Sequence, residues 1–242
     1  MSSAAVTGER DLGRVPGWFG KIPALGDFAM RRMPSEFVTV WDDWLQRSLA
    51  ATADALGAGW LDLYRHSPIL RFALLPGLCG ASLWAGIVMP SVDRVGRYFP
   101  LTIALALEER PGALAAAICA HDWFAALEEV ALRTLERDAS PEELDVGLAE
   151  VGFPWTPGDV GPAAALADWW RATPTAPFTT EVTDVGRLDD LILAGAEAVF
   201  TTSGRGRSLW WTRGTGATRL LCFSGLPPAE RFVELLGGAA PR

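Results

Sequence analysis

Lysine, histidine and cysteine are scarce in this sequence. Lys21 is the only lysine among 242 residues, and the chain has two histidines and three cysteines. Arginine supplies the rest of the positive side-chain charge, a bias that a genome rich in G and C would produce without any functional cause. The formal net charge is −8. Because such a chain repels anionic surfaces, we expect neither a nucleic-acid partner nor membrane insertion.

The few cysteines and histidines exclude several kinds of site. Cys79, Cys119 and Cys222 lie too far apart for a disulfide framework or a metal cluster, so we expect all three to be buried in a reducing cytosol. His66 and His121 are too few for a His-Asp metallophosphohydrolase. A phosphate-binding glycine loop, a serine nucleophile elbow and a CxxC pair are missing as well. We therefore expect no catalytic residues, no metal and no cofactor.

Long apolar runs are also missing. No window approaches the roughly 18 consecutive apolar residues of a membrane-spanning helix, and the first 14 residues lack the apolar core of a secretory signal. We therefore expect a cytoplasmic protein. Residues 1–14 are small and polar and are predicted to form a disordered leader. Residues 15–242 are predicted to form a single domain, because half of the chain is hydrophobic and can fill a sizeable core.

Hydrophobic periodicity predicts an α/β fold, specifically a three-layer αβα sandwich with a mixed central sheet. Large and small apolar residues alternate over 98–107, so both faces of that strand should be covered. The predicted strands are 69–75, 82–89, 98–107, 198–202, 208–213 and 218–224. Helices are predicted over 34–48, 60–66, 112–137 and 162–173, and from residues 140 and 227 onward. Ser35 and Ser140 are expected to cap two of them.

Most of the eleven tryptophans are predicted to lie in the core. Those in apolar stripes are Trp41, Trp44, Trp84 and Trp123. Trp210 and Trp211 are neighbours, so within a strand their side chains point to opposite faces, and we expect one of the two to be exposed.

Two segments stand out as tightly shaped loops. Residues 17–28, GWFGKIPALGDF, place three glycines around a proline turn that ends in an acid between apolar residues. Residues 89–100, MPSVDRVGRYFP, place one carboxylate and two guanidinium groups on a connection between strands. Two interpretations are open for this connection. Asp93 could pin its loop by pairing with Arg94 or Arg97, or these charges could face a ligand or a partner.

Together with residues 41–45 (WDDWL), 67–72 (SPILRF) and 84–86 (WAG), these two segments resemble the TagF family of bacterial type VI secretion accessory proteins. The resemblance is strongest over residues 18–107 and weaker up to residue 137. We interpret residues 138–242 as a variable C-terminal part of the same domain.

The resemblance implies a cytosolic α/β protein that represses the secretion machine after translation by binding its forkhead-associated (FHA) scaffold protein. Some members of the family are fused to a serine/threonine phosphatase domain, whose Asp-rich metal motifs are missing here. We therefore expect a non-enzymatic repressor that sequesters its partner.

We expect the two loops to lie near each other and to form a polar surface that binds the partner. The residues assigned to this partner-binding surface are Lys21, Asp27, Ser91, Asp93, Arg94 and Arg97. The alternative is a sensor or enzyme for a small ligand, a phosphate or a nucleotide, which would use Asp27, Asp93, Arg94 and Arg97.

Overall fold

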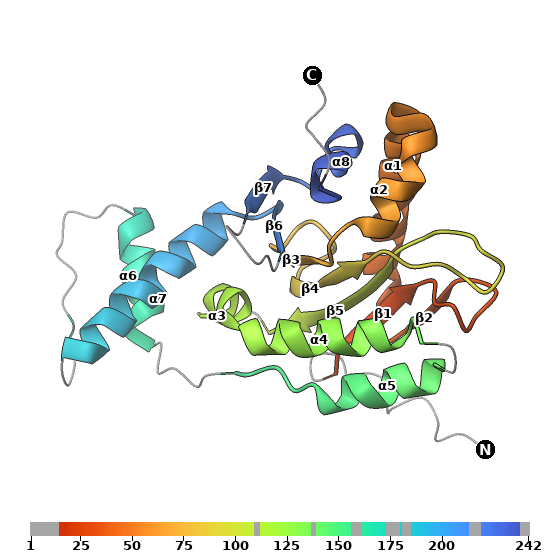
Figure 1. The fold of residues 1–242 in the computed structure, drawn as a ribbon. Helices are drawn as coiled ribbons and strands as arrows, with labels where there is room; N and C mark the ends of the chain where they lie inside the picture. Colours follow the sequence, from red (N-terminus) through yellow and green to blue (C-terminus); the bar gives the residue numbers. More distant parts are fainter. Residues whose placement is uncertain are drawn as a thin grey trace, which may run out of the picture.

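The computed structural model describes residues 15–108, 112–136, 139–155, 161–172, 180, 185–212 and 219–237. A seven-stranded sheet carries helices on both of its faces (Figure 1). The predicted α/β class is therefore confirmed. The strands are β1 (Gly17–Gly20), β2 (Ala29–Arg31), β3 (Leu70–Leu74), β4 (Leu83–Met89), β5 (Leu101–Leu107), β6 (Arg207–Thr212) and β7 (Leu220–Ser224).

All neighbouring strands of the sheet are antiparallel, in the order β2-β1-β5-β4-β3-β6-β7. The prediction of a mixed sheet is thus wrong. A strand covered on both faces is typical of parallel sheets, but here helices cover both faces of an antiparallel sheet. The register places Gly20 opposite Leu101. The segment that follows β1 and the segment that precedes β5 therefore meet at the same end of the sheet.

One face of the sheet packs against an aromatic cluster. The helices on this face are α1 (Ser35–Leu56), a 3₁₀ turn over Gly57–Gly59, α2 (Trp60–His66), a 3₁₀ turn over Ala229–Arg231 and α8 (Phe232–Leu235). Trp41 lies at the centre of the cluster and is fully buried. Its ring centroid is 4.8 Å from that of Trp44, 4.9 Å from Phe72 and 5.9 Å from Trp210. Its indole N–H donates to the Thr102 hydroxyl at 2.8 Å, which satisfies both buried polar groups.

The opposite face packs against α3 (Ala113–Cys119) and α4 (His121–Arg133) (Figure 1). One continuous helix was expected over residues 112–137, but the helix breaks at Ala120, whose ψ of 51° is not helical. The apolar stripe continues across the break, since Leu114, Phe124 and Leu127 are all buried. Sequence periodicity does not register such a break.

Helix α5 (Pro141–Glu150) is attached to the edge of the sheet. The predicted cap is confirmed, because the Ser140 hydroxyl accepts the backbone N–H of Glu143 at 3.1 Å and Glu143 accepts the N–H of Ser140 at 2.8 Å. Asp145 then accepts the indole N–H of Trp18 at 2.9 Å and a guanidinium N–H of Arg32 at 2.7 Å. These contacts fix α5 against β1 and the end of β2.

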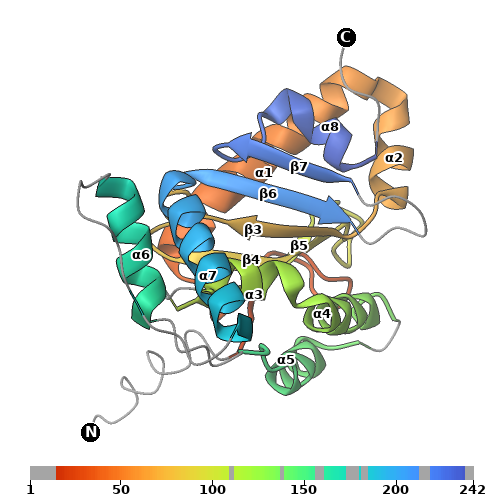
Figure 2. The same ribbon diagram turned by 90° about the vertical axis from the view of Figure 1, so that its left-hand side faces the viewer.

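Helices α6 (Gly161–Ala172) and α7 (Val185–Ser203) lie side by side next to the sheet (Figure 2). The strand predicted for residues 198–202 is wrong, because this segment is the last part of α7. Its run of Val, Phe and Thr has high strand propensity, but tertiary contacts override propensity here. Glu197 faces α3, where its carboxylate accepts the N–H groups of Leu114 at 2.7 Å and Ala115 at 3.1 Å.

Three smaller expectations also change. Ser35 is the first residue of α1, and Pro34 occupies the cap position without a side-chain hydrogen bond. Trp210 and Trp211 are both buried, because each face of β6 is covered by helices. Cys119 and Cys222 are exposed, whereas Cys79 is buried as expected. The leader predicted for residues 1–14 lies outside the described residues.

Candidate functional site

The glycine loop, residues 21–28, leads from β1 back into β2. The N–H of Leu25 donates to the carbonyl oxygen of Ile22 at 3.0 Å and closes the turn. Gly20, just before the loop, has a φ of 136°, and a Cβ there would lie 2.1 Å from the carbonyl oxygen of Pro100. Only glycine is compatible with both features. The glycine loop can therefore approach the connection between β4 and β5 closely.

The arginine loop, residues 90–100, connects β4 to β5 and folds around one carboxylate. Asp93 Oδ1 accepts the N–H groups of Val95 at 3.0 Å and Arg97 at 2.9 Å. Asp93 Oδ2 accepts the Nε–H of Arg97 at 2.7 Å. The sequence left open whether Arg94 or Arg97 pairs with Asp93. The structure selects Arg97.

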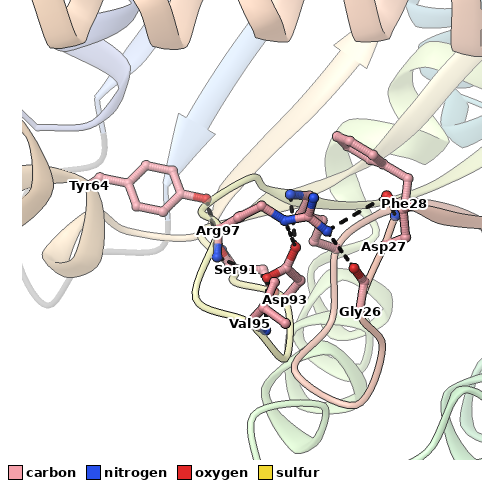
Figure 3. Close-up of polar contacts among 9 residues, drawn as sticks. Gly26, Asp27, Phe28, Tyr64, Ser91, Asp93, Val95 and Arg97 are labelled. Carbon is pink, nitrogen blue, oxygen red and sulfur yellow. Dashed lines mark hydrogen bonds and ion pairs between the residues drawn. The ribbon is translucent and has the colours of Figure 1, made fainter.

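The same carboxylate joins the arginine loop to the glycine loop (Figure 3). Lys21 Nζ lies 3.0 Å from Asp93 Oδ2, and both side chains are almost completely buried. The guanidinium group of Arg97 donates to the carbonyl oxygen of Gly26 and lies 3.9 Å from the carboxylate of Asp27. The expectation that the two loops lie together is thus confirmed. We call them the paired loops.

The environment of Asp93 keeps its carboxyl group ionised. Burial alone would raise the pKa, but the N–H of Arg97, the ammonium of Lys21, the guanidinium of Arg97 and the N–H of Val95 all favour the charged form. Together they hold the pKa of Asp93 well below its usual range. All the hydrogen-bonding capacity of this carboxylate is directed into the loops.

Ser91 is held from the opposite side by α2. The Tyr64 hydroxyl donates to the carbonyl oxygen of Ser91 at 3.0 Å and accepts the N–H of Ser91 at 3.0 Å (Figure 3). Burial raises the pKa of Tyr64 well above its ordinary value, so the phenol remains a neutral donor. Tyr64 therefore fixes the start of the arginine loop. Sequence reasoning did not identify this residue.

The predicted site residues fall into a buried group and an exposed group. Lys21, Ser91 and Asp93 are each 5% exposed or less, so they shape the paired loops from inside and offer a partner almost no surface. The exposed group is Asp27, Arg94 and Arg97. Of the two arginines, Arg97 is bound within the loops, whereas Arg94 forms no side-chain ion pair with any described residue.

Two exposed apolar side chains lie among these charges and were missed in the sequence. Val95, at the tip of the arginine loop, is 67% exposed. Phe28, at the end of the glycine loop, is 44% exposed, although its ring contacts Phe99 at a centroid distance of 4.7 Å and the Lys21 ammonium at 4.8 Å. The sequence contains one indication of an exposed apolar side chain here, because Val95 stands between Arg94 and a glycine in a polar turn. The surface is thus mixed, with apolar and cationic groups side by side.

The paired loops combine an internally bound carboxylate with exposed charged and apolar groups. In the part of the chain that the structure describes, no group of three His, Cys, Asp or Glu side chains is placed to hold a metal ion. The carboxylate of Asp93 is occupied by two cations and two N–H groups, so it is a poor general base. The described cavities are lined by residues outside residues 17–28 and 89–100. The exposed groups of the loops are available for contact with a macromolecule.

Comparison with known protein families identifies the chain. Residues 17–151, more than half of the sequence, match the family model described as the TagF N-terminal domain, type VI secretion system-associated. The chain belongs to the TagF family. The matched segment contains both paired loops, Tyr64 and α5, so the family match covers the whole candidate site.

A solved structure extends the similarity beyond the matched segment. The crystal structure of PA0076 from Pseudomonas aeruginosa PAO1 is 34% identical in sequence and covers 94% of this TagF chain and 96% of its own, with a TM-score of 0.71. No curated protein matches the chain. Among the described residues of this TagF protein, no helix has the length and apolar character needed to span a membrane.

Proposed function

We propose that this TagF chain is a non-enzymatic repressor of type VI secretion, which acts in the cytoplasm, after translation, by binding the FHA-domain scaffold protein of the machine. Membership of a type VI secretion-associated family supports the connection to the machine. The proposed binding role rests on the exposed surface of the paired loops. This surface surrounds the carboxylate of Asp93, whose hydrogen bonds are all made within the loops.

The chemistry of this surface suits a protein partner. Aromatic and arginine side chains dominate the energy of protein interfaces, because they combine apolar area with directed hydrogen bonds. Phe28 and Arg94 supply one of each, and Val95 adds apolar area beside them. Internal hydrogen bonds hold the paired loops in one shape, which lowers the entropy lost on binding. Among the described residues, Arg94 is the one arginine of the paired loops that forms no ion pair, so its guanidinium group can pair with an acidic group of the partner.

The alternative of a small-ligand sensor or enzyme has less support. It would need Asp93 and Arg97 to face a ligand, whereas these two side chains bind each other at 2.7 Å. Asp27 and Arg94 remain exposed on the surface of the loops. Two exposed opposite charges offer little to select one ligand.

Replacing Arg94 by glutamate tests the binding role. We expect the Arg94→Glu protein to melt within a few degrees of the wild type, because an exposed side chain without an ion pair contributes little to stability. Its affinity for the purified FHA scaffold should fall by roughly thirtyfold or more, since a reversed charge in an interface costs about 2 kcal/mol or more. Isothermal titration calorimetry would measure the affinity of the wild type and of Arg94→Glu for the scaffold.

Arg205→Glu is the matched control, because Arg205 is also exposed and unpaired among the described residues but lies at the α7–β6 turn. Equal affinity of all three proteins would contradict the assigned surface. Arg97→Glu is unsuitable for this test. Arg97 binds Asp93 and Gly26, so reversing its charge would separate the loops and disturb the fold together with the surface.

A further inference from the structure

The sheet ends at β7, at the opposite edge from β1 and β2. Among the described residues, β7 pairs with β6 and with no other strand, so one of its sides is an open edge. Figure 2 shows β7 as the outermost strand, with α1 and α8 behind it. Exposed residues of this strand alternate with partly buried ones, and Leu220 is 57% exposed.

The backbone of β7 directs unused hydrogen-bonding groups to this edge. In an antiparallel ladder, residues whose N–H and C=O groups face the neighbouring strand alternate with residues whose groups face away. The N–H of Gly225 donates to the carbonyl oxygen of Gly206 at 2.7 Å, so Gly225 faces β6. By alternation, Phe223 and Leu221 face β6 as well. The other residues of β7 face away and form no backbone hydrogen bond with any described residue: Leu220, Cys222 and Ser224.

The sequence of β7 does not protect this edge. Proteins commonly block exposed edge strands with charged side chains, proline or a bulge. The strand LLCFS contains no charge and no proline, and its register with β6 is continuous over all five residues. Since the chain has a net charge of −8, an uncharged strand is where a second copy can approach with little repulsion.

The pattern of outward groups on β7 is complementary to itself. Antiparallel pairing of two β7 strands about Cys222 places Leu220 of each copy opposite Ser224 of the other. Every outward N–H and C=O group then meets an outward group of the second copy. On the face that packs against the aromatic cluster, Leu221 lies opposite Phe223 of the other copy. Both side chains are only partly buried within one chain, and such apolar pairs across strands stabilise sheets.

We propose that two copies of this chain associate by antiparallel pairing of their β7 strands, with the two-fold axis at Cys222. A second copy is the occupant because one symmetric contact satisfies both open edges at once. The paired loops lie at the opposite edge of the sheet, beside β1 and β2, and stay free in the dimer. The proposal is therefore independent of the binding role of the paired loops.

Sedimentation of the intact, reduced protein tests the association. We expect the wild type to dimerise reversibly as its concentration rises. Cys222→Lys should weaken dimerisation by about tenfold or more, because two ammonium groups then face each other across the axis. The melting temperature of this variant should stay within a few degrees of the wild type, since the side chain of Cys222 is exposed.

Cys119→Lys is the matched control. Cys119 is also exposed, but it lies at the end of α3 and not on β7. The two substitutions change the side chain and the net charge in the same way. We expect Cys119→Lys to change the dissociation constant of the dimer by less than about twofold.

Oxidation with diamide gives a second, independent measurement. Hydrogen-bonded antiparallel residues have Cα atoms about 5.5 Å apart, which is within the range of a disulfide. In the proposed dimer this applies to Cys222 and its copy. Cys119→Ser should therefore form a disulfide-linked dimer, seen by non-reducing electrophoresis, and Cys222→Ser should not.

Three results would overturn the proposal. A wild type that stays monomeric at its highest soluble concentration would show that the edge does not bind a second copy. Equal weakening by Cys222→Lys and Cys119→Lys would attribute the association to overall charge. Cross-linking through Cys119 as readily as through Cys222 would place the contact between copies outside β7.

Discussion

Truncation of Trp41 to alanine should lower the free energy of unfolding by about 3 to 5 kcal/mol. Trp41 is fully buried and contacts the rings of Phe37, Trp44, Phe72 and Trp210. Its removal leaves a large cavity in rigid surroundings, and it also leaves the buried hydroxyl of Thr102 without its donor. Urea unfolding followed by circular dichroism would measure the loss.

Trp41→Phe serves as the comparison, because it retains much of the apolar volume and loses only the indole donor. We expect it to be clearly more stable than Trp41→Ala. If Trp41→Ala unfolds at the same urea concentration as the wild type, Trp41 cannot be the centre of this core. Any loss of partner binding in Trp41→Ala should be attributed to unfolding and not to the binding surface.

Replacing Asp93 by asparagine should lower the melting temperature by roughly 10 °C, since the buried ammonium group of Lys21 loses its counter-ion. Asparagine has almost the same shape but no charge, and its amide group would face the Lys21 ammonium and the Arg97 guanidinium. The glycine loop and the arginine loop should then separate. Differential scanning fluorimetry would give the melting temperature, and partial proteolysis would locate the opened loops.

The pH dependence of stability in the wild type and in Asp93→Asn shows whether the charge of Asp93 causes the difference between them. The pKa of Asp93 is lowered in the folded state. Its contribution to stability is therefore fully present above the unfolded pKa of about 3.9 and is lost as the pH falls through the lower folded value. The difference between the wild type and Asp93→Asn should be constant near neutral pH and shrink in acid. A difference that does not change down to acidic pH would contradict an ionised Asp93 as its source.

The sequence predicted the central strands because their apolar patterns are long. Strands β3, β4 and β5 were expected within three residues of where they lie. Strands β1 and β2 were missed, because they span four and three residues, and a short glycine-bounded segment has no usable periodicity. The direction of pairing was misjudged for a different reason. Burial on both faces does not determine whether neighbouring strands run parallel or antiparallel.

The candidate site was predicted in part. The sequence showed that Asp93 and two arginines share a loop, and local geometry then allowed only two pairings. The contact of Asp93 with Lys21 depends on the pairing of β1 with β5, which joins segments far apart in the chain. Sequence spacing could not reveal this contact, and it could not show that Lys21 is buried.

Secretion by living cells tests the central claim most directly. Deleting the gene in a bacterium with an inducible type VI machine should raise the export of the machine's secreted proteins without raising the transcripts of its genes. Restoring the wild-type chain should lower export again, whereas Arg94→Glu, produced at the same cellular level, should not. Unchanged export after deletion would contradict the account, as would full repression by Arg94→Glu.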